Sequence, residues 1–287
     1  MSAGETRHRL LTNSPEKTVS INEAGLSLAS FSLREIWAYR ELLYFLTWRD
    51  IKVRYKQTVM GAAWAIIQPL FMMLIFAVFF GILIGVPTEG MPFLIFYYCG
   101  LLPWTFVGNG VVNSSMSLIN SSNLITKVYF PRILVPLAAT GAGLVDLLIS
   151  SLILLGLGIY YKMNLGTSIV VIPLLLLLSV FLTLAVGIWL AALIVKYRDI
   201  RHVLPFVLQI WMFLTPIIYP MGVVPDKWQW IVQINPLTGV VEGIRASLMG
   251  RALDKQALFV SVGITAAMLL CGIYTFRRIE KTFADLI

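Results

Sequence analysis

Charged residues are scarce in this sequence. Asp, Glu, Lys and Arg together make up 13% of the 287 residues, whereas hydrophobic residues make up 59%. Soluble domains usually carry about 25% charged residues. The mean hydropathy of +0.85 therefore excludes a surface that faces water throughout and indicates that a lipid bilayer is the solvent of most of the chain.

Histidine and cysteine are equally scarce, which excludes several kinds of site. Cys99 and Cys271 lie inside apolar runs without CxxC or Cys/His spacing, so no disulfide framework and no metal site is predicted. His8 lies in a polar stretch and His202 in a basic loop. An enzyme at the membrane surface needs paired acids or a histidine–acid motif, which makes an enzymatic role the weaker hypothesis.

No glycine in the sequence is followed directly by lysine. A phosphate-binding loop needs a glycine-rich turn that ends in Gly-Lys-Ser/Thr. The chain is therefore expected to bind no cofactor itself, and any ATP and Mg²⁺ that drive its work must be bound by a partner. The net charge of +8 is typical of basic residues that flank membrane spans and fix their orientation. It predicts contact with membrane lipids and no nucleic-acid partner.

Six apolar runs are long enough to cross a hydrocarbon core about 30 Å thick. The predicted fold class is therefore all-α, a polytopic membrane protein with six transmembrane helices. We expect the spans at residues 61–86, 92–112, 133–160, 168–195, 203–221 and 257–276, within a transmembrane domain of residues 61–276. Pro205 and Pro216 are expected to mark the start of the fifth span and a kink in it.

Lys and Arg are distributed unevenly about these spans. If both ends lie inside, the inner segments 1–60, 113–132, 196–202 and 277–287 hold 17 of the 22 basic residues. The outer segments 87–91, 161–167 and 222–256 hold the other five. Basic residues favour the cytoplasmic side, so a polar tail over 1–30 and a second tail over 277–287 are both predicted to be cytoplasmic.

Two segments are expected to lie at the membrane faces without crossing. Residues 31–60 begin with the capping-box spacing of Ser32 and Glu35 and then mix apolar with charged residues. They predict an N-terminal amphipathic helix in the cytoplasmic interface, followed by a basic segment. Residues 222–256 are broken at Asn235-Pro236 and are too apolar for a solvated loop, so we expect a re-entrant helical hairpin at the outer face.

Several motifs resemble permeases that export O-antigen, capsule or teichoic-acid polymers, a branch of the ABC exporters. The resemblance covers roughly residues 31–287. The motifs are the run Thr47-Trp48-Arg49-Asp50-Ile51-Lys52-Val53-Arg54-Tyr55-Lys56 with Met60-Gly61, Trp64 and Gln68-Pro69, then Leu102-Pro103-Trp104, Tyr197-Arg198-Asp199-Ile200 with Pro216 and Tyr219, and Asn235-Pro236 with Glu242 and Arg245. One departure is visible, because Met60-Gly61 stands where the family often has Leu-Gly.

The resemblance implies a transport subunit of the bacterial cytoplasmic membrane and not an enzyme. It implies that two copies of the chain pair with two copies of a separate cytoplasmic ABC ATPase. It further implies that the dimer interface forms a conduit for an undecaprenyl-pyrophosphate-linked glycan, with O-antigen the first choice. The alternatives are a drug or small-lipid exporter of the same superfamily and, less favoured, a membrane transferase that acts on undecaprenyl lipids.

The basic segment after the interfacial helix is a candidate entry site. Its residues are Arg49, Lys52, Arg54 and Lys56, followed by Met60 and Gly61 as an adjoining gate. Arginine pairs with phosphate oxygens in a fork geometry, so the cluster is a candidate ligand for the pyrophosphate. On a helix, Arg49, Lys52 and Lys56 share one face and Arg54 points elsewhere. The alternative is charge that fixes topology and contacts anionic lipid.

The inner loop 113–132 is a candidate docking element for the ATPase. Its apolar side is formed by Met116, Leu118, Ile119, Leu124 and Ile125. A short helix there is expected to enter a cleft of the ATPase, as the family implies, and the alternative is an ordinary connection between spans.

Further candidates lie near the middle or outer ends of the spans. The channel or gate candidates are Tyr97, Tyr98, Trp104, Asp146 and Tyr219. The alternatives are an interfacial aromatic belt and, for Asp146, a structural hydrogen bond to Ser150 one turn on. Glu242 and Arg245 are spaced to pair on one helix and are expected to hold the outer hairpin.

Overall fold

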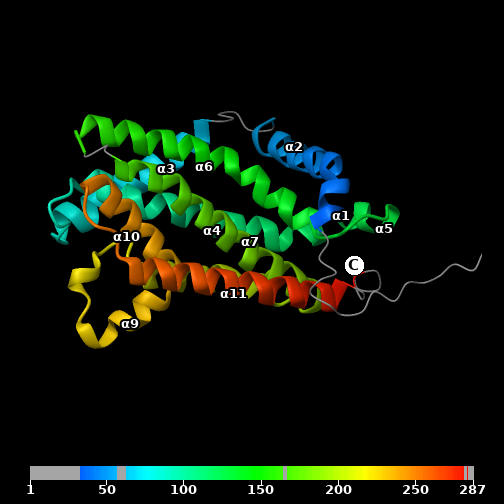
Figure 1. Cartoon of the computed structure of the whole chain (residues 1–287). Coiled ribbons are helices and arrows are strands. Elements are labelled where there is room, and N and C mark those ends of the chain that lie inside the picture. Colours follow the sequence, from blue (N-terminus) through cyan, green and yellow to red (C-terminus); the bar gives the residue numbers. More distant parts are fainter. Residues whose placement is uncertain (1–32, 57–62, 164–166, 281–282, 284–287) are drawn as a thin grey trace, which may run out of the picture. The chain divides into compact units, whose positions relative to one another are not determined.

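The computed structural model describes residues 33–56, 63–163, 167–280 and 283, and these form helices and connections without a strand. The helices belong to one compact unit and are shown in Figure 1. They are α1 (Leu33–Ala38), α2 (Arg40–Lys56), α3 (Trp64–Phe76) continued by the π-helix η3 (Ala77–Leu83), α4 (Phe93–Asn120), α5 (Ser122–Lys127), α6 (Leu134–Tyr160), α7 (Val171–Lys196) preceded by the 3₁₀ turn η4 (Thr167–Val170), α8 (Ile200–Leu214), the 3₁₀ turn η5 (Met221–Val223), α9 (Asp226–Ile234), α10 (Pro236–Met249) and α11 (Lys255–Glu280).

The all-α class is confirmed, with five helices long and apolar enough to span a membrane among the described residues. They are α3 with η3, α4, α6, α7 and α11. The expected fifth span, 203–221, corresponds to α8, which has only 15 residues and a length of about 22 Å. It ends at Leu214, before Pro216, so the structure does not confirm a sixth full span.

The second span extends further than predicted. α4 continues to Asn120, so residues 113–120 are helical and the connection to α6 begins only at Ser121. The serines there suggested a loop, but their hydroxyls bond to backbone within the bundle. Ser117 Oγ donates to the Ser114 carbonyl at 2.6 Å, and Ser114 Oγ donates to the Pro136 carbonyl of α6 at 3.2 Å.

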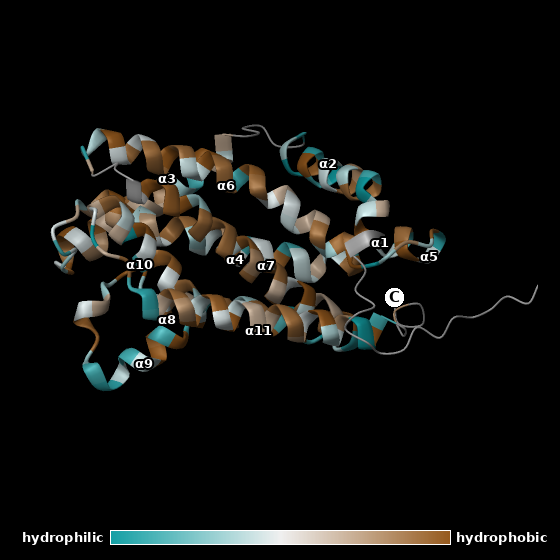
Figure 2. Ribbon diagram, in the orientation of Figure 1, coloured by the Kyte–Doolittle hydropathy of each residue, from teal (hydrophilic) through white to brown (hydrophobic). Residues whose placement is uncertain are grey.

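α4 and α7 form the centre of the bundle because small residues let them approach closely. A β-carbon added to Gly110 of α4 would lie 2.5 Å from Thr183 Cγ2 of α7, and one added to Gly187 would lie 2.7 Å from Ser114 Cβ. In membranes, helix association depends on such close packing between small residues. Figure 2 shows the apolar residues along these helices and the hydrophilic ones gathered on α2, α5 and α9.

The N-terminal segment forms the helices α1 and α2, of which α2 packs along α6. A β-carbon on Gly141 of α6 would lie 3.3 Å from Thr47 Cγ2 of α2, and Arg54 further along α2 contacts Asp146. α2 and α6 therefore run in the same direction where they meet. Trp37, Tyr44, Phe45 and Trp48 are exposed, and the interfacial location of α2 stays a prediction.

We predict that Gly187→Val forces α4 away from α7, because the new side chain would overlap Ser114. Overpacking of this kind costs about 1–3 kcal/mol, so the thermal unfolding midpoint in detergent should fall. Gly263→Val is the matched control, because a β-carbon on Gly263 of α11 meets no atom within 4 Å. Equal midpoints for the two variants would contradict the tight α4–α7 contact.

Candidate functional site

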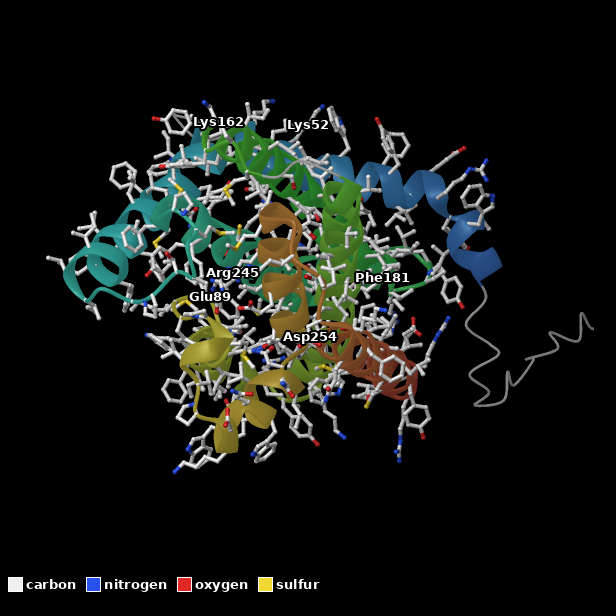
Figure 3. All side chains as sticks on the ribbon, turned by 60° about the vertical axis from the view of Figure 1, so that its left-hand side comes forward. Lys52, Glu89, Lys162, Phe181, Arg245 and Asp254 are labelled. Carbon is white, nitrogen blue, oxygen red and sulfur yellow. The ribbon has the colours of Figure 1, made fainter. Side chains whose placement is uncertain are left out.

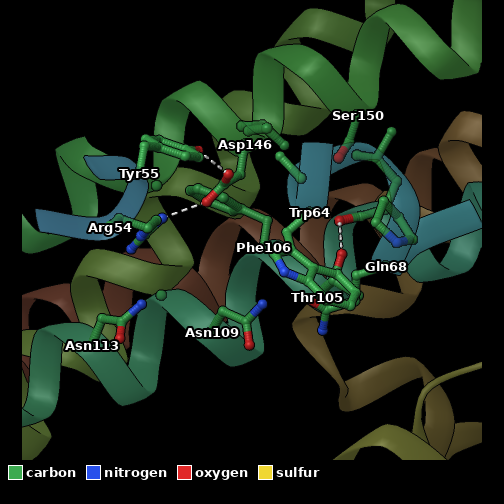
Figure 4. Close-up of a pocket in the computed structure, with 16 residues that line it drawn as sticks. Arg54, Tyr55, Trp64, Gln68, Thr105, Phe106, Asn109, Asn113, Asp146 and Ser150 are labelled. Carbon is green, nitrogen blue, oxygen red and sulfur yellow. Dashed lines mark hydrogen bonds and ion pairs between the residues drawn. The ribbon is translucent and has the colours of Figure 1, made fainter. Parts of the chain in front are cut away.

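A polar cavity of about 250 Å³ lies between the end of α2, the start of α3, α4 and α6 (Figure 4). Its polar lining residues are Arg54, Tyr55, Gln68, Thr105, Asn109, Asn113, Asp146 and Ser150, with Trp64 and Phe106 among its aromatic walls. Five residues of the motif that introduced the family resemblance, Arg54, Tyr55, Trp64, Gln68 and Pro69, thus border one space. Polar side chains are rare inside membrane spans and usually mark a pathway or a binding site.

Asp146 is bound by two donors from α2. Arg54 Nη1 donates to one oxygen of the carboxylate, and the Tyr55 hydroxyl donates to the other. Ser150, the partner considered for Asp146, instead accepts a hydrogen bond at its carbonyl from the Tyr98 hydroxyl at 3.0 Å. The structural hydrogen bonding considered as an alternative for Asp146 is present, but its donors are Arg54 and Tyr55, because sequence spacing could not reveal that α2 packs there.

The depth of this ion pair follows from the length of α6. Asp146 lies about 14 residues before Tyr160, the exposed residue that ends the helix, which corresponds to about 21 Å. Asp146 is 12 residues from Leu134 at the other end, so it lies near the middle of a helix long enough to span a hydrocarbon core about 30 Å thick. A charge at that depth is costly unless it is paired, so Arg54 and Asp146 stabilise each other.

A polar stripe on α4 completes the cavity. Thr105, Asn109 and Asn113 recur every fourth residue and so share one helix face, and Gln68 of α3 borders the same space. The Thr105 hydroxyl bonds to the Leu101 carbonyl at 2.8 Å, whereas Asn109 and Asn113 have exposed side chains. Sequence reasoning missed this stripe, although the spacing of amides within a span was a usable signal.

The aromatic channel candidates lie elsewhere. Tyr97 and Tyr98 are fully buried, and Trp104 packs edge-on against Trp211 with ring centroids 5.9 Å apart. Tyr219 is half-buried, and its hydroxyl bonds to the Phe213 carbonyl at 3.1 Å. Within one copy of the chain these rings serve packing, and none of them lines the polar cavity.

The basic segment divides between the two sides of α2. Arg49, Lys52 and Lys56 are exposed as their spacing predicts, while Arg54 turns toward α6. Arg49 pairs with Asp50 at 2.9 Å. Lys52 lies over the ring of Trp48 and projects outward at the periphery in Figure 3. Met60 and Gly61, the expected gate, fall outside the described residues.

The segment expected to dock the ATPase buries much of its apolar side in the chain itself. Leu118 and Ile125 are buried, Met116 and Ile119 pack against the core, and Leu124 is partly covered. These side chains are therefore largely committed to the bundle. The exposed hydrophobic residues of this segment follow α5. Val128 is half-exposed and Tyr129 is 95% exposed, and neither was identified from the sequence.

The pair of Glu242 and Arg245 forms as expected. Arg245 Nη1 lies 2.8 Å from Glu242 Oε1, and the guanidinium also donates to the carbonyls of Pro216 at 2.7 Å and Ile217 at 2.9 Å. It stacks 3.7 Å above the centre of the Phe96 ring and lies inside the molecule in Figure 3. Burial raises the pKa of Glu242, and the nearby Arg245 opposes that shift.

Asn235 plays a matching part at the break between α9 and α10. Its side chain accepts from the Leu237 amide at 3.1 Å, which caps α10. It also accepts from Trp211 Nε1 at 2.9 Å and donates to Thr215 Oγ1 at 2.8 Å. Asn235 also donates to the Leu214 carbonyl at 3.3 Å, so Asn235 and Arg245 together bind the backbone carbonyls where α8 ends.

The chain matches one protein family and several curated proteins. The ABC-2 type transporter family matches residues 41–249, which include every residue named at the cavity. The chain is 28% identical over 256 residues to the O-antigen export system permease protein RfbA of Myxococcus xanthus, which covers 88% of this chain and 98% of that protein. It is 27% identical over 248 residues to a protein of the same name from Klebsiella pneumoniae, covering 86% and 95%. It is 26% identical over 242 residues to the polysialic acid transport protein KpsM of Escherichia coli, covering 81% and 91%.

We predict that Arg245→Met destabilises the fold strongly, because Glu242 and two carbonyls lose their buried partner. Removing one member of a buried ion pair costs about 3–5 kcal/mol. The matched control is Arg251→Met, which breaks the exposed pair with Glu89 at 2.6 Å and should change stability by about 0.5 kcal/mol or less. Thermal unfolding in detergent measures both, and similar losses would contradict the structural role of Arg245.

Proposed function

The chain belongs to the ABC-2 type transporter family, and on this premise we propose that it is the membrane permease of an ATP-driven exporter of lipid-linked polysaccharide. The substrate class is an undecaprenyl-pyrophosphate-linked glycan, with O-antigen the first candidate. The polar cavity carries the proposal, because amides and hydroxyls inside apolar helices suit a hydroxyl-rich cargo. The names of the relatives, which refer to O-antigen export and polysialic acid transport, support a polysaccharide cargo.

The cavity also argues against the alternative of a drug or small-lipid exporter. An apolar cargo gains little from Gln68, Asn109 and Asn113, whose desolvation costs free energy unless they are hydrogen-bonded. A glycan offers many hydroxyl donors and acceptors and can satisfy them along its length. We therefore place Asn109 and Asn113 on the wall of the export path in preference to the buried rings of Tyr97 and Tyr98.

We propose that the path is completed by a second copy of this chain. Exposed amides cannot face lipid without cost, so the open side of the α4 stripe needs protein, water or cargo in front of it. A twofold dimer places the same stripe on both sides of a shared conduit. The cargo then meets amides from both copies.

We propose that the chain lies in the bacterial cytoplasmic membrane with both ends in the cytoplasm. α1, α5 and the end of α11 lie at one end of the bundle, opposite α9 and α10 (Figure 1). The first group adjoins the basic inner segments, which supports this orientation. The buried residues of α10 and the carbonyls bound by Arg245 support α9 and α10 as the re-entrant hairpin of the outer face.

A separate ABC ATPase supplies the energy in this proposal and binds ATP and Mg²⁺, since the chain has no phosphate-binding loop. Two copies would serve a permease dimer. We propose that the ATPase docks on the exposed surface after α5, with Tyr129 as the residue that inserts into the ATPase. The adjoining backbone is fixed, because Arg132 Nη1 donates to the Glu280 carbonyl at the end of α11 at 2.8 Å.

We predict that Tyr129→Ala weakens binding of the partner ATPase about tenfold, because an exposed aromatic ring at an interface commonly contributes more than 1 kcal/mol. Co-purification at graded ATPase concentrations measures the loss. Tyr160→Ala is the matched control, since Tyr160 is equally available at the opposite end of α6. Unchanged ATPase binding by Tyr129→Ala would refute the assigned docking surface.

We predict that Arg49→Gln, Lys52→Gln and Lys56→Gln together lower glycan export and substrate-stimulated ATPase activity, because the exposed basic face of α2 attracts the pyrophosphate at the inner leaflet. The matched control neutralises Arg7, Arg9 and Lys17, which removes three charges from the same predicted side. Export of the glycan to the cell surface and the abundance of correctly oriented permease are measured together. Normal export by the first variant, or a loss explained by inverted protein, would assign the cluster to topology alone.

A further inference from the structure

Arg54 and Tyr55 hold Asp146 as they would hold a phosphate. The guanidinium and the phenol donate to the two oxygens of one carboxylate, and a phosphate offers the same kind of paired acceptors. Arginine is suited to such planar, charge-assisted contacts. The carboxylate thus occupies the position that an incoming anion on these two donors would take.

The surroundings fit an anion that arrives with a polar cargo. Arg54 is the only cation among the described residues that line the cavity, and Asp146 is the only acid. Arg49 is engaged by Asp50, while Lys52 and Lys56 project from the other side of α2. Asn109 and Asn113 border the same space and offer neutral N–H donors to an anion or to hydroxyl groups beside it (Figure 4).

The position of Arg54 within the membrane explains why it needs an anionic partner before the substrate arrives. An unpaired Arg54 beside the middle of a span-length helix would be costly, and Asp146 removes that cost while no ligand is present. Both side chains keep about a third of their surface exposed, 29% for Arg54 and 36% for Asp146. The pair therefore borders the open cavity and is accessible to exchange.

We propose that Asp146 holds the place of the substrate's phosphate, and that a lipid-linked phosphate group displaces it from Arg54 and Tyr55 on entering the cavity. This inference rests on the proposed function and names a contact inside the cavity, beyond the exposed face of α2. The exchange keeps Arg54 paired throughout, and it leaves the Asp146 carboxylate without its two donors while the phosphate is bound. Asp146 is a competitor of the ligand and sets how tightly it is held.

The test is binding of farnesyl pyrophosphate to the full-length permease in nanodiscs of neutral lipid. Asp146→Asn removes the competing charge at nearly constant shape, so we expect affinity to rise about tenfold. Arg54→Gln should lower affinity about tenfold or more. Glu41→Gln is the matched control, because it removes the same charge from the exposed start of α2 and should leave affinity unchanged.

The sign of the Asp146→Asn effect decides the matter. A purely structural ion pair predicts unchanged or weaker binding, and either result overturns the proposal. If Asp146→Asn fails to fold, Tyr55→Phe decides, because it keeps the ion pair and removes one donor. Binding about threefold weaker supports the site, and unchanged binding refutes it.

Two further arms separate the sources and the hypotheses. If inorganic pyrophosphate also binds, and with the same dependence on Asp146, the site recognises the phosphate group alone. If farnesyl pyrophosphate binds and inorganic pyrophosphate does not, the site recognises the lipid-linked form. If the wild-type complex exports glycan but Asp146→Asn binds farnesyl pyrophosphate with wild-type affinity, this inference is refuted and the proposed function stands. Asp146-dependent binding without glycan export refutes the proposed function and leaves the phosphate site standing.

Discussion

Hydrocarbon offers no hydrogen bonds, so a polar group that this chain places in the membrane is costly unless it finds a partner in the protein, in water or in a cargo. Continuous helices meet that constraint along α4, α6, α7 and α11. α8 ends at Leu214, and beyond it the backbone carbonyls need hydrogen-bond donors from side chains. Arg245 and Asn235 supply the missing donors there, which makes them as necessary to the fold as the apolar contacts around them.

The same constraint separates structural from functional polar groups. Arg245 is 4% exposed and is bound by a carboxylate, backbone carbonyls and an aromatic ring. A second cavity of about 190 Å³ borders Arg245 and Glu242, but protein groups on several sides already bind the guanidinium. Arg54 and Asp146 are paired but open to a cavity, and Asn109 and Asn113 are exposed beside them. Polar groups left open in a dry environment are costly, and their retention points to a cargo that completes them.

The sequence predicted those features that depend on local pattern. Apolar length located five spans, and spacing along one helix predicted both the pair of Glu242 with Arg245 and the exposed face of Arg49, Lys52 and Lys56. It failed where contacts between distant segments decide the outcome. The partner of Asp146 lies on α2, about 90 residues earlier, and the helical state of residues 113–120 depends on α6 and α7. The aromatic candidates were chosen by residue type, which carries no information about the direction in which a ring points.

α4 connects the two functional regions that the structure separates in space. One uninterrupted helix carries Asn109 and Asn113 at the cavity and continues to Asn120, directly before the docking segment. Its contact with α7 at Gly110 and Gly187 leaves no room for the helix to bend independently of its neighbour. Force applied by an ATPase at α5 would therefore move α4 as a rigid rod, and the cavity wall would move with it. Because Arg54 and Asp146 bridge α2 to α6 and not to α4, a shift of α4 would change the space beside the ion pair without first breaking the pair.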